Sequence, residues 1–425
     1  RCVRCENILS HERPESAPAL GHSFGEDGVC ADCGAVKITE KTAFENSLKT
    51  AKGDHAVLAL TEDIDGAKMR FPKAADAKEI LIGDNGHTLG FTGSGSIRPA
   101  QALTLKDICV KAANTKGKPQ NISVVGAAGG LTLDNVSFDG KRASVSSTKG
   151  DLLLREVKAD DLVVKGSAKR SCTIEGEVLV TTLSGFGELV IDGTLTVKKS
   201  LTVNNLTVGT DGRLIVEKGA QVNIKKQLFG LSGVIELKEG FKPIKLPGEP
   251  VGYVRLESEK TLENMQLFAS KQTALEEVID IGAAVPPVED GEYNYGLYTK
   301  SGKVFVYPMK LAMDGKTYAA WADLINAVNK AKNSSAEYTI RLLGDVDIGA
   351  ALRFPIKNRY KALTIDGSGY SLSFTGKTHT LTGNLTLKNV CLSALNRGKP
   401  IQWTLKKNKF SLNRKNAELI NCTIK

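Results

Sequence analysis

The chain has 425 residues, a formal net charge of +10, 41% hydrophobic residues and only 6% aromatic residues. This length allows two or three domains, the hydrophobic content excludes a chain that is disordered throughout, and no apolar run is long enough for a membrane span. The basic balance favours acidic polysaccharide, teichoic acid or nucleic acid as a partner, unless the lysines only keep exposed strand positions soluble. Nucleic acid is the weakest of these partners, because no basic segment is interleaved with aromatic residues for base stacking.

Residues 1–36 form a cysteine-rich module. It contains two Cys-x-x-Cys pairs, Cys2 with Cys5 and Cys30 with Cys33. Two such pairs can present four thiolates to one tetrahedral zinc ion, so the spacing predicts a structural zinc site that leaves no open position for catalysis. Two local disulfides or unligated thiols in an exported protein are the alternatives.

The second cysteine pair ends a longer phrase, Pro18-Ala-Leu-Gly-His-Ser-Phe-Gly-Glu-Asp-Gly-Val-Cys-Ala-Asp-Cys-Gly34. This phrase resembles the cysteine-rich repeats of large cell-surface proteins of Gram-positive gut bacteria, where Pro-Ala-x-Gly-His precedes a Cys-x-x-Cys-Gly knuckle. It covers less than a tenth of the chain, and the first pair departs from the pattern because Glu6 follows Cys5. The resemblance implies an exported, wall-associated bacterial protein built from several modules.

Residues 37–270 are predicted to form a β-helix with a helical cap. Thr42 and Glu45 have the spacing of a capping box, and Phe44, Leu48 and Ala51 fall on one helix face. Because the first turn of a solenoid needs a cover, we expect this helix to close the N-terminal end of a stack that begins near Ile97.

One strand phrase recurs between residues 102 and 240. In each copy apolar residues alternate with polar ones, and a polar turn residue precedes a further apolar residue. The first three copies start 28 and 21 residues apart, the period of a solenoid whose turns bury their apolar faces against one another. We predict inward rows formed by Leu103, Leu105, Leu131, Leu133, Leu152 and Leu154. The four copies are Leu103-Thr-Leu-Lys-Asp-Ile108, Leu131-Thr-Leu-Asp-Asn-Val136, Leu152-Leu-Leu-Arg-Glu-Val157 and Leu201-Thr-Val-Asn-Asn-Leu206.

The rest of the chain repeats this beginning. Residues 271–316 are predicted to be a β-rich connector with an acidic, proline-bearing hinge at 283–291, and residues 317–425 to be the start of a second β-helix. Met69-Arg-Phe-Pro72 recurs 283 residues later as Leu352-Arg-Phe-Pro355, and the phrase at Leu103 recurs 282 residues later at Leu385. A second amphipathic helix has its apolar face at Trp321, Leu324, Ile325 and Val328. The chain therefore contains an internal duplication.

The strand phrase with its Asn or Asp turn, together with Ile365-Asp-Gly-Ser-Gly369, resembles the right-handed parallel β-helix proteins of the pectate-lyase-like superfamily. The resemblance covers most of residues 40–270 and 317–425, and the general rule for crossovers between parallel strands gives the same hand. It implies a mainly β fold. In the members that are enzymes, it also implies clustered aspartates that bind calcium or perform acid–base hydrolysis.

Few residues here match such a cluster, and no catalytic residue is predicted. Asp63 with Asp65, and their copies Asp345 with Asp347, could hold a cation or serve as an acid–base pair, or they end strands as turn residues. Asp160 and Asp161 form a weaker pair. Four cysteines are predicted to be small core residues, and two duplicated basic turns are the best candidates for a polyanion contact, unless they are only solvated turns. The cysteines are Cys109, Cys172, Cys391 and Cys422, and the turns carry Lys116 with Lys118 and Arg397 with Lys399.

These sequence features are compatible with three functions. The first is a non-enzymatic extracellular protein of the cell surface, an adhesin-like or stalk-forming element that contacts anionic polysaccharide or a host or neighbouring cell. The second is a polysaccharide lyase or glycoside hydrolase on the same fold, and the third is a zinc-ribbon protein that binds nucleic acid. The duplication, the closed cysteine site and the lack of clustered carboxylates favour the first. Self-assembly through the last turn of the second stack is a further expectation, ranked below a longer parent chain.

Overall fold

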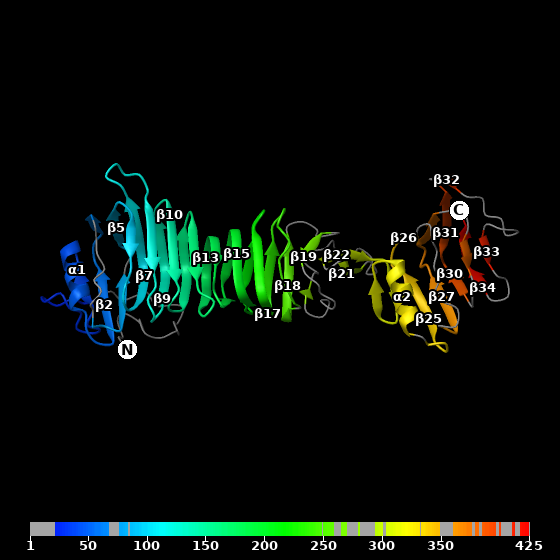
Figure 1. The fold of residues 1–425 in the computed structure, drawn as a ribbon, viewed down its shortest axis with the longest axis horizontal. Coiled ribbons are helices and arrows are strands. Elements are labelled where there is room, and N and C mark those ends of the chain that lie inside the picture. The colour runs from blue at the N-terminus through cyan, green and yellow to red at the C-terminus, as the bar shows by residue number, and fades with distance from the viewer. Residues whose placement is uncertain are drawn as a thin grey trace. The chain divides into compact units, whose positions relative to one another are not determined.

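The computed structural model describes residues 22–67, 76–83, 86–248, 250–258, 265–269, 279–280, 294–300, 303–331, 333–348, 360–375, 379–381, 385–396, 399–400, 410–412 and 417–424. The chain divides into two compact units, residues 1–260 with 267–284, and residues 261–266 with 285–425 (Figure 1). The division falls within the connector predicted at 271–316, whereas the predicted hinge at 283–291 and both Arg-Phe-Pro phrases lie outside the described residues. In the described part of the chain, no helix is long and apolar enough to span a membrane.

The first unit is a parallel β-solenoid. Its strands pair almost throughout with strands one turn earlier and one turn later, which confirms the mainly β stack predicted from the strand phrase. The right-handed sense stays a prediction. Helix α1 (Lys41–Thr50) accompanies strands β1 (Val36–Ile38), β2 (His55–Leu60), β3 (Ile64–Ala67), β4 (Glu79–Gly83), β5 (Thr88–Thr92), β6 (Gly95–Ile97), β7 (Ala102–Ala113), β8 (Asn121–Val125), β9 (Leu131–Asp139), β10 (Arg142–Ser147), β11 (Leu152–Ala159), β12 (Leu162–Gly166), β13 (Ser171–Ser184), β14 (Glu188–Ile191), β15 (Thr194–Val208), β16 (Arg213–Val216), β17 (Gln221–Leu237), β18 (Val251–Ser258) and β20 (Ile279–Asp280).

Three sheet faces run along this stack. Face 1 consists of β1, β2, β4, the first halves of β7, β9, β11 and β13, then β14, the end of β15, the middle of β17 and the start of β18. Face 2 runs from β3 and β5 through the second halves of β7, β9 and β11 to β16 and the ends of β17 and β18. Face 3 consists of β6, β8, β10, β12, the end of β13, the middle of β15 and the start of β17.

The predicted inward rows are confirmed. All six leucines are 0–2% exposed, and Leu133 lies in register with Leu105 on one side and Leu154 on the other. A corner follows each strand, where Asp107, Asn135 and Glu156 adopt left-handed backbone conformations with φ of 49°, 52° and 51°. The corners stack as well, since the Asn135 side-chain amide donates a hydrogen bond of 2.8 Å to Asp107 Oδ1. Each corner therefore turns the chain from face 1 to face 2 while the next apolar residue stays inside.

The fourth copy of the phrase occupies a different corner. Leu201 pairs with Leu183 on face 3, and Leu206 pairs with Leu189 on face 1, so this copy turns the chain from face 3 to face 1. Asn205 is not among the residues with positive φ, unlike its predicted counterparts in the first three copies. Its apolar residues are nevertheless fully buried, because alternation about any corner of the stack fills the same core.

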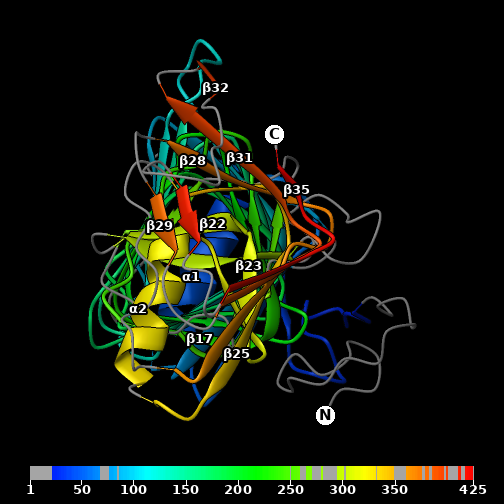
Figure 2. The ribbon, with the colours of Figure 1, turned by 90° about the vertical axis from the view of Figure 1, so that its right-hand side faces the viewer.

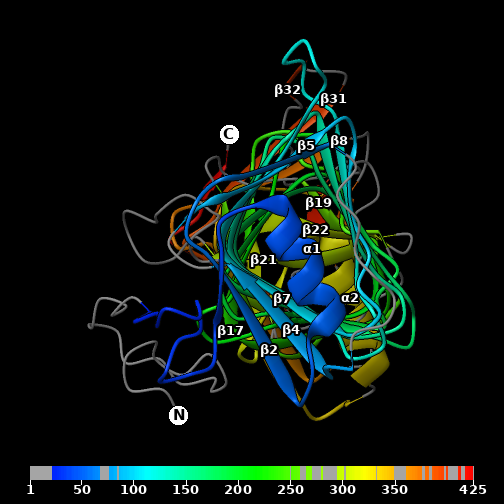
Figure 3. The ribbon, with the colours of Figure 1, turned by 90° about the vertical axis from the view of Figure 1, so that its left-hand side faces the viewer.

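Helix α1 buries the side chains that its periodicity marks. Phe44 is fully buried, Leu48 is 1% exposed and Ala51 is 9% exposed. The predicted capping box is wrong, because the helix begins one residue before Thr42 and Glu40 is its N-cap, without a side-chain capping bond. The stack also begins earlier than predicted, with β1 paired to β2 and β2 to β4. Figure 3 shows α1 lying across the end of the stack where β2 and β4 lie, and its role as a cap stays a prediction.

The second unit opens with two antiparallel hairpins and continues with parallel strands. β25, β27, β30 and β34 form one parallel sheet, while β26, β28, β31 and β35 form another (Figure 2). Its elements are α2 (Trp321–Ala331) and strands β21 (Asn294–Lys300), β22 (Lys303–Met309), β23 (Leu311–Met313), β24 (Lys316–Tyr318), β25 (Glu337–Leu342), β26 (Val346–Asp347), β27 (Ala362–Asp366), β28 (Ser371–Thr375), β29 (His379–Leu381), β30 (Leu385–Lys388), β31 (Cys391–Asn396), β32 (Lys399–Pro400), β33 (Phe410–Leu412), β34 (Ala417–Ile420) and β35 (Thr423–Ile424). β19 (Gln266–Phe268) spans the division between the units.

The two units share local structure at the duplicated positions. In each, an amphipathic helix precedes parallel strands, and the predicted apolar face of α2 lies in the core of the second unit. Asn389 and Asn421 take the left-handed conformation with φ of 50° and 51°, and Asn421 donates its amide to Asn389 Oδ1 over 3.0 Å. The sequence duplication thus corresponds to a repeated set of corners as well as a repeated set of strands.

Candidate functional site

The strongest candidate for a metal site lies just before the first sheet. His22, Cys30 and Cys33 bring one ligand atom each to within 4.8 Å of one another, and Cys33 Sγ lies 3.3 Å from His22 Nδ1. In the described part of the chain, this is the only group of three or more His, Cys, Asp or Glu residues that could hold a metal ion. Of the four predicted zinc ligands, the structure therefore brings Cys30 and Cys33 together, while Cys2 and Cys5 lie outside the described residues.

Local backbone geometry shapes this cysteine knuckle. The Gly34 amide donates to the Cys30 carbonyl over 2.8 Å, and the Cys30 amide donates to the Ala35 carbonyl over 2.9 Å. Gly34 follows the second cysteine with φ of 70°, a conformation that glycine adopts without steric cost. Immediately afterwards, Val36 enters β1 and pairs with Leu58 of β2. The knuckle is therefore fixed to the first turn of the solenoid.

The donors suit zinc chemically. Burial alone would raise the pKa of the Cys30 thiol, but hydrogen bonds from the backbone of Cys33 and Asp32 and from the His22 side chain lower it to about 6. Soft thiolates with an imidazole are a typical zinc donor set, and zinc–ligand bonds of about 2.0–2.3 Å place tetrahedral sulfur and nitrogen ligands roughly 3.5 Å apart. The observed separation of 3.3 Å between Cys33 Sγ and His22 Nδ1 is close to that value. The sequence pattern missed His22, although this residue lies in the Gly-His phrase before the knuckle.

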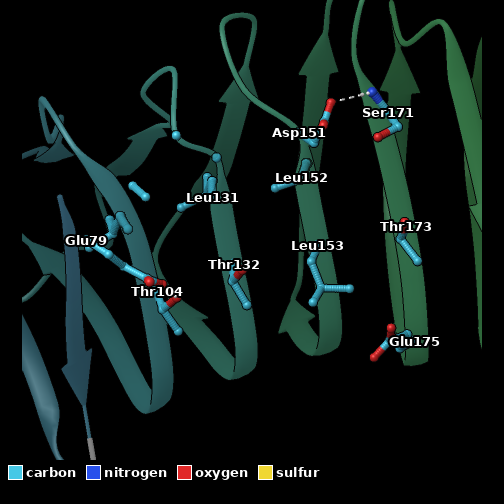
Figure 4. Close-up of a pocket in the computed structure, with 14 residues that line it drawn as sticks. Glu79, Thr104, Leu131, Thr132, Asp151, Leu152, Leu153, Ser171, Thr173 and Glu175 are labelled. Carbon is cyan, nitrogen blue, oxygen red and sulfur yellow. Dashed lines mark hydrogen bonds between the residues drawn. The ribbon is translucent and has the colours of Figure 1, made fainter. Parts of the chain in front are cut away.

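A shallow groove runs across face 1 of the first unit. Its volume is about 500 Å³, and its floor crosses five strands from β4 to β13. Figure 4 shows Thr104, Thr132, Leu153 and Thr173 on successive strands, where the pairing places them in one outward column. Three carboxylates, those of Glu79, Asp151 and Glu175, line the same groove. The groove is thus the place where this fold could carry acid–base chemistry.

Each of these carboxylates already has a partner within the stack. Glu79 contacts His55 Nδ1 at 3.0 Å and accepts a hydrogen bond of 3.3 Å from the Thr104 hydroxyl. Asp151 Oδ1 accepts the Ser171 amide over 2.9 Å, which is the dashed contact in Figure 4. Their roles are to tie neighbouring strands together.

Glu175 belongs to a charged ladder. Arg155 Nε donates to Glu175 over 2.8 Å, and its Nη1 donates to Asp134 over 3.2 Å, so one guanidinium joins three consecutive strands. Partial burial opposes the charged form of Arg155, but these two carboxylates raise its pKa above the ordinary value. Arg213 repeats the arrangement with Glu236 and Glu257 farther along the stack. Such ladders stabilise the sheet, and the Glu175 carboxylate is already paired with Arg155.

The duplicated aspartates serve as strand-end acceptors. Asp63 Oδ1 accepts the Thr88 amide over 2.7 Å, and Asp345 Oδ1 accepts the Ser371 amide over 2.8 Å at the equivalent place in the second unit. The Thr88 amide is the main reason why the pKa of Asp63 is lowered. Asp161 is held by Arg142 over 2.7 Å. These contacts favour the turn interpretation over a cation site or an acid–base pair.

The cysteines outside the knuckle differ from the prediction in three cases. Cys172 is fully buried, and burial raises the pKa of its thiol. Cys109 and Cys391 are only partly buried, so the prediction that both are core residues is wrong. At Cys109 the reason is the corner at Asp107, which makes Ile108 and Val110 the inward residues and turns Cys109 outward. Cys422 is also only partly buried, packed against the second core, so the prediction is wrong for this residue too.

The two duplicated basic turns are described unequally. Lys116 and Lys118 are exposed in the turn between β7 and β8, and both donate their backbone amides to Asn114 Oδ1, over 2.9 and 3.0 Å. Arg397 lies outside the described residues, and Lys399 begins β32. The Asn114 contacts explain the shape of the first turn, while its lysine side chains remain available to solvent.

Comparison with known proteins identifies no relative of this chain. No protein-family model, no curated protein and no solved structure matches this chain.

Proposed function

We propose that this chain is a non-enzymatic extracellular protein of the bacterial cell surface, an adhesin-like or stalk-forming scaffold that contacts anionic polysaccharide. The observation that carries the proposal is that every carboxylate of the groove on face 1 already contacts a residue of a neighbouring strand. A glycosidase needs a carboxyl pair free to donate and accept protons at the scissile bond, and Glu79, Asp151 and Glu175 are each engaged by a neighbouring strand. The phrase ending at Gly34, with its resemblance to wall-associated proteins, supports the location.

A polysaccharide lyase or glycoside hydrolase is the second candidate. The groove of about 500 Å³ on face 1 favours it, because ligand and active sites are clefts of roughly this size with a few polar groups, and this one contains three carboxylates. Its hydroxyl column at Thr104, Thr132 and Thr173 could contact sugar hydroxyls without any chemistry. The groove is therefore compatible with sugar binding without catalysis. We place catalysis second because the groove carboxylates are already bonded to neighbouring strands.

We further propose that the cysteine knuckle holds a structural zinc ion through His22, Cys30 and Cys33, with the fourth ligand supplied by Cys2 or Cys5. When bound, zinc would supply cross-linking energy to a short segment that has little core of its own. That core consists of Cys30, Ala35 and Ala59, with Phe24, Cys33 and Val57 packed against it.

Surface labelling of intact cells of the source organism tests the location. An antibody against the first unit should label unpermeabilised cells, and brief protease treatment of whole cells should remove the signal. A cytoplasmic protein followed in the same samples should stay unlabelled and undigested. Labelling only after permeabilisation would contradict the proposed function, because an intracellular chain cannot contact an external polysaccharide.

A further inference from the structure

One side of the first unit differs from the others in charge. From β12 to the segment after β17, the outward residues of face 3 include no Asp or Glu. Over the same stretch, face 1 carries Glu175 and Glu188, and face 2 carries Glu177 and Glu236. The register arranges these outward residues of face 3 in two columns along the stack. The columns are Val163, Thr182, Ser200 and Gln221, and Lys165, Ser184, Thr202, Asn223 and Lys245.

Cations lie at intervals along the second column and its edge. Lys165 and Lys245 are its two ends, Lys169 follows β12 in the turn toward face 1, and Lys225 and Lys226 follow the face 3 part of β17 in the equivalent turn. All five side chains are exposed. Within the described residues none of the five makes an ion pair, in contrast to Arg142, Arg155 and Arg213.

The spacing suits a linear partner laid along the stack. Neighbouring parallel strands are about 4.8 Å apart, so Lys165 and Lys245, four strand steps apart, are separated by roughly 19 Å. Hydroxyl and amide side chains fill the interval, and they can donate to carboxylates and exchange hydrogen bonds with sugar hydroxyls. No aromatic side chain points outward in either column, which removes the stacking platform that single-stranded nucleic acid needs.

We propose that face 3, between Lys165 and Lys245, binds a carboxylated polysaccharide that runs parallel to the stack axis. The lysines meet the carboxylates, and the serine, threonine, asparagine and glutamine side chains of the two columns meet the sugar hydroxyls. This inference rests on the proposed function and assigns its surface and its ligand class. The groove on face 1 is not this site, because its lining carboxylates, those of Glu79, Asp151 and Glu175, disfavour a polyanion there.

Replacing three lysines with uncharged glutamine tests the assignment on the full chain. In the variant Lys165→Gln/Lys225→Gln/Lys245→Gln, binding of polygalacturonate should weaken by roughly tenfold or more, and the dependence of affinity on salt should become less steep. The matched control is Lys49→Gln/Lys52→Gln/Lys158→Gln, which removes the same charge from exposed lysines that are not on face 3. The control should stay within about twofold of the unchanged protein, because the ligand contacts one face. Circular dichroism and thermal unfolding of both variants should match the unchanged protein, since all six lysines are exposed.

Four outcomes would overturn the inference. Equal losses in the two variants would mean that only net charge matters, and no loss in either would remove face 3 from binding. Equal affinity for polyphosphate, which has no sugar hydroxyls, would contradict the polysaccharide assignment, as would tighter binding of single-stranded DNA. If polygalacturonate binds equally well with and without the three lysines, face 3 is not the binding surface but the proposed function still stands. Internal location on labelling of cells rejects the proposed function whatever face 3 binds.

Discussion

Replacing Leu133 with Asp is expected to unfold the first unit or to lower its stability beyond the range in which it stays folded. Leu133 is fully buried, and it lies between Leu105 and Leu154 in one row of the core. The change removes a packed leucine, which costs about 2–5 kcal/mol, and adds a buried carboxylate without a partner, which costs several more. The sum reaches the size of the whole stability of a typical domain, about 5–15 kcal/mol. Far-ultraviolet circular dichroism and urea denaturation of the full chain measure the effect.

Thr132→Asp provides the matched control for this substitution. Thr132 is the preceding residue of β9 and lies in the outward column of face 1, so the new carboxylate stays in contact with water. We expect a loss of about 1 kcal/mol, because Thr132 is half-buried and the main cost is the lower strand propensity of Asp. A folded Leu133→Asp variant with the urea midpoint of the control would contradict the inward assignment of the row.

Removal of the metal is expected to unfold the cysteine knuckle while the solenoid stays intact. Structural zinc contributes on the order of 10 kcal/mol to the folding of small zinc modules, and the knuckle has only a small core of its own. Purified protein should contain one zinc per chain, and His22→Ala should lose it together with hydrogen-exchange protection of residues 24–36. Protection of β7, β9 and β11 should stay unchanged, because their core is formed by stacked leucines. Metal analysis and hydrogen exchange with mass spectrometry provide both measurements.

His55→Ala is the matched control for the metal prediction. His55 is an exposed histidine of β2 that contacts Glu79, so its loss should leave the zinc content unchanged. Zinc-free protein with Cys2, Cys5, Cys30 and Cys33 all oxidised would reject zinc in favour of disulfides. Full zinc content in His22→Ala would keep the metal but remove His22 from its ligands.

The core of the stack was predictable from the sequence because its signal is local. Alternation of leucines around a polar turn residue marks Leu103, Leu131 and Leu152 as inward whatever the rest of the chain does. The duplication was visible for the same reason, since two copies of one local solution keep the same residues at the same offsets. The helices were found by periodicity, although a side-chain spacing alone misplaced the N-cap of α1 by two residues, from Thr42 to Glu40.

The corner positions, the third metal ligand and the surface columns depend on which strands become neighbours, and local sequence patterns do not predict strand pairing. The phrase at Leu201 looks like the copies at Leu103 and Leu131 but occupies the corner between face 3 and face 1. His22 is eight residues from Cys30, and only the folded turn brings it beside Cys33. The acid-free columns of face 3 join residues from four strands, so no window of sequence contains them. Local periodicity therefore predicted the core, whereas the surfaces required the register.

The measurement that tests this account most directly follows binding and cleavage of a polysaccharide in one experiment. The full chain is incubated with polygalacturonate, the bound fraction is determined by co-sedimentation, and the length of the recovered polymer is determined by size-exclusion chromatography. A non-enzymatic scaffold predicts that the polymer is bound and keeps its length after prolonged incubation, with no new reducing or unsaturated ends. Progressive shortening that depends on the protein and disappears in Glu175→Gln would contradict the account and assign the groove on face 1 as an active site.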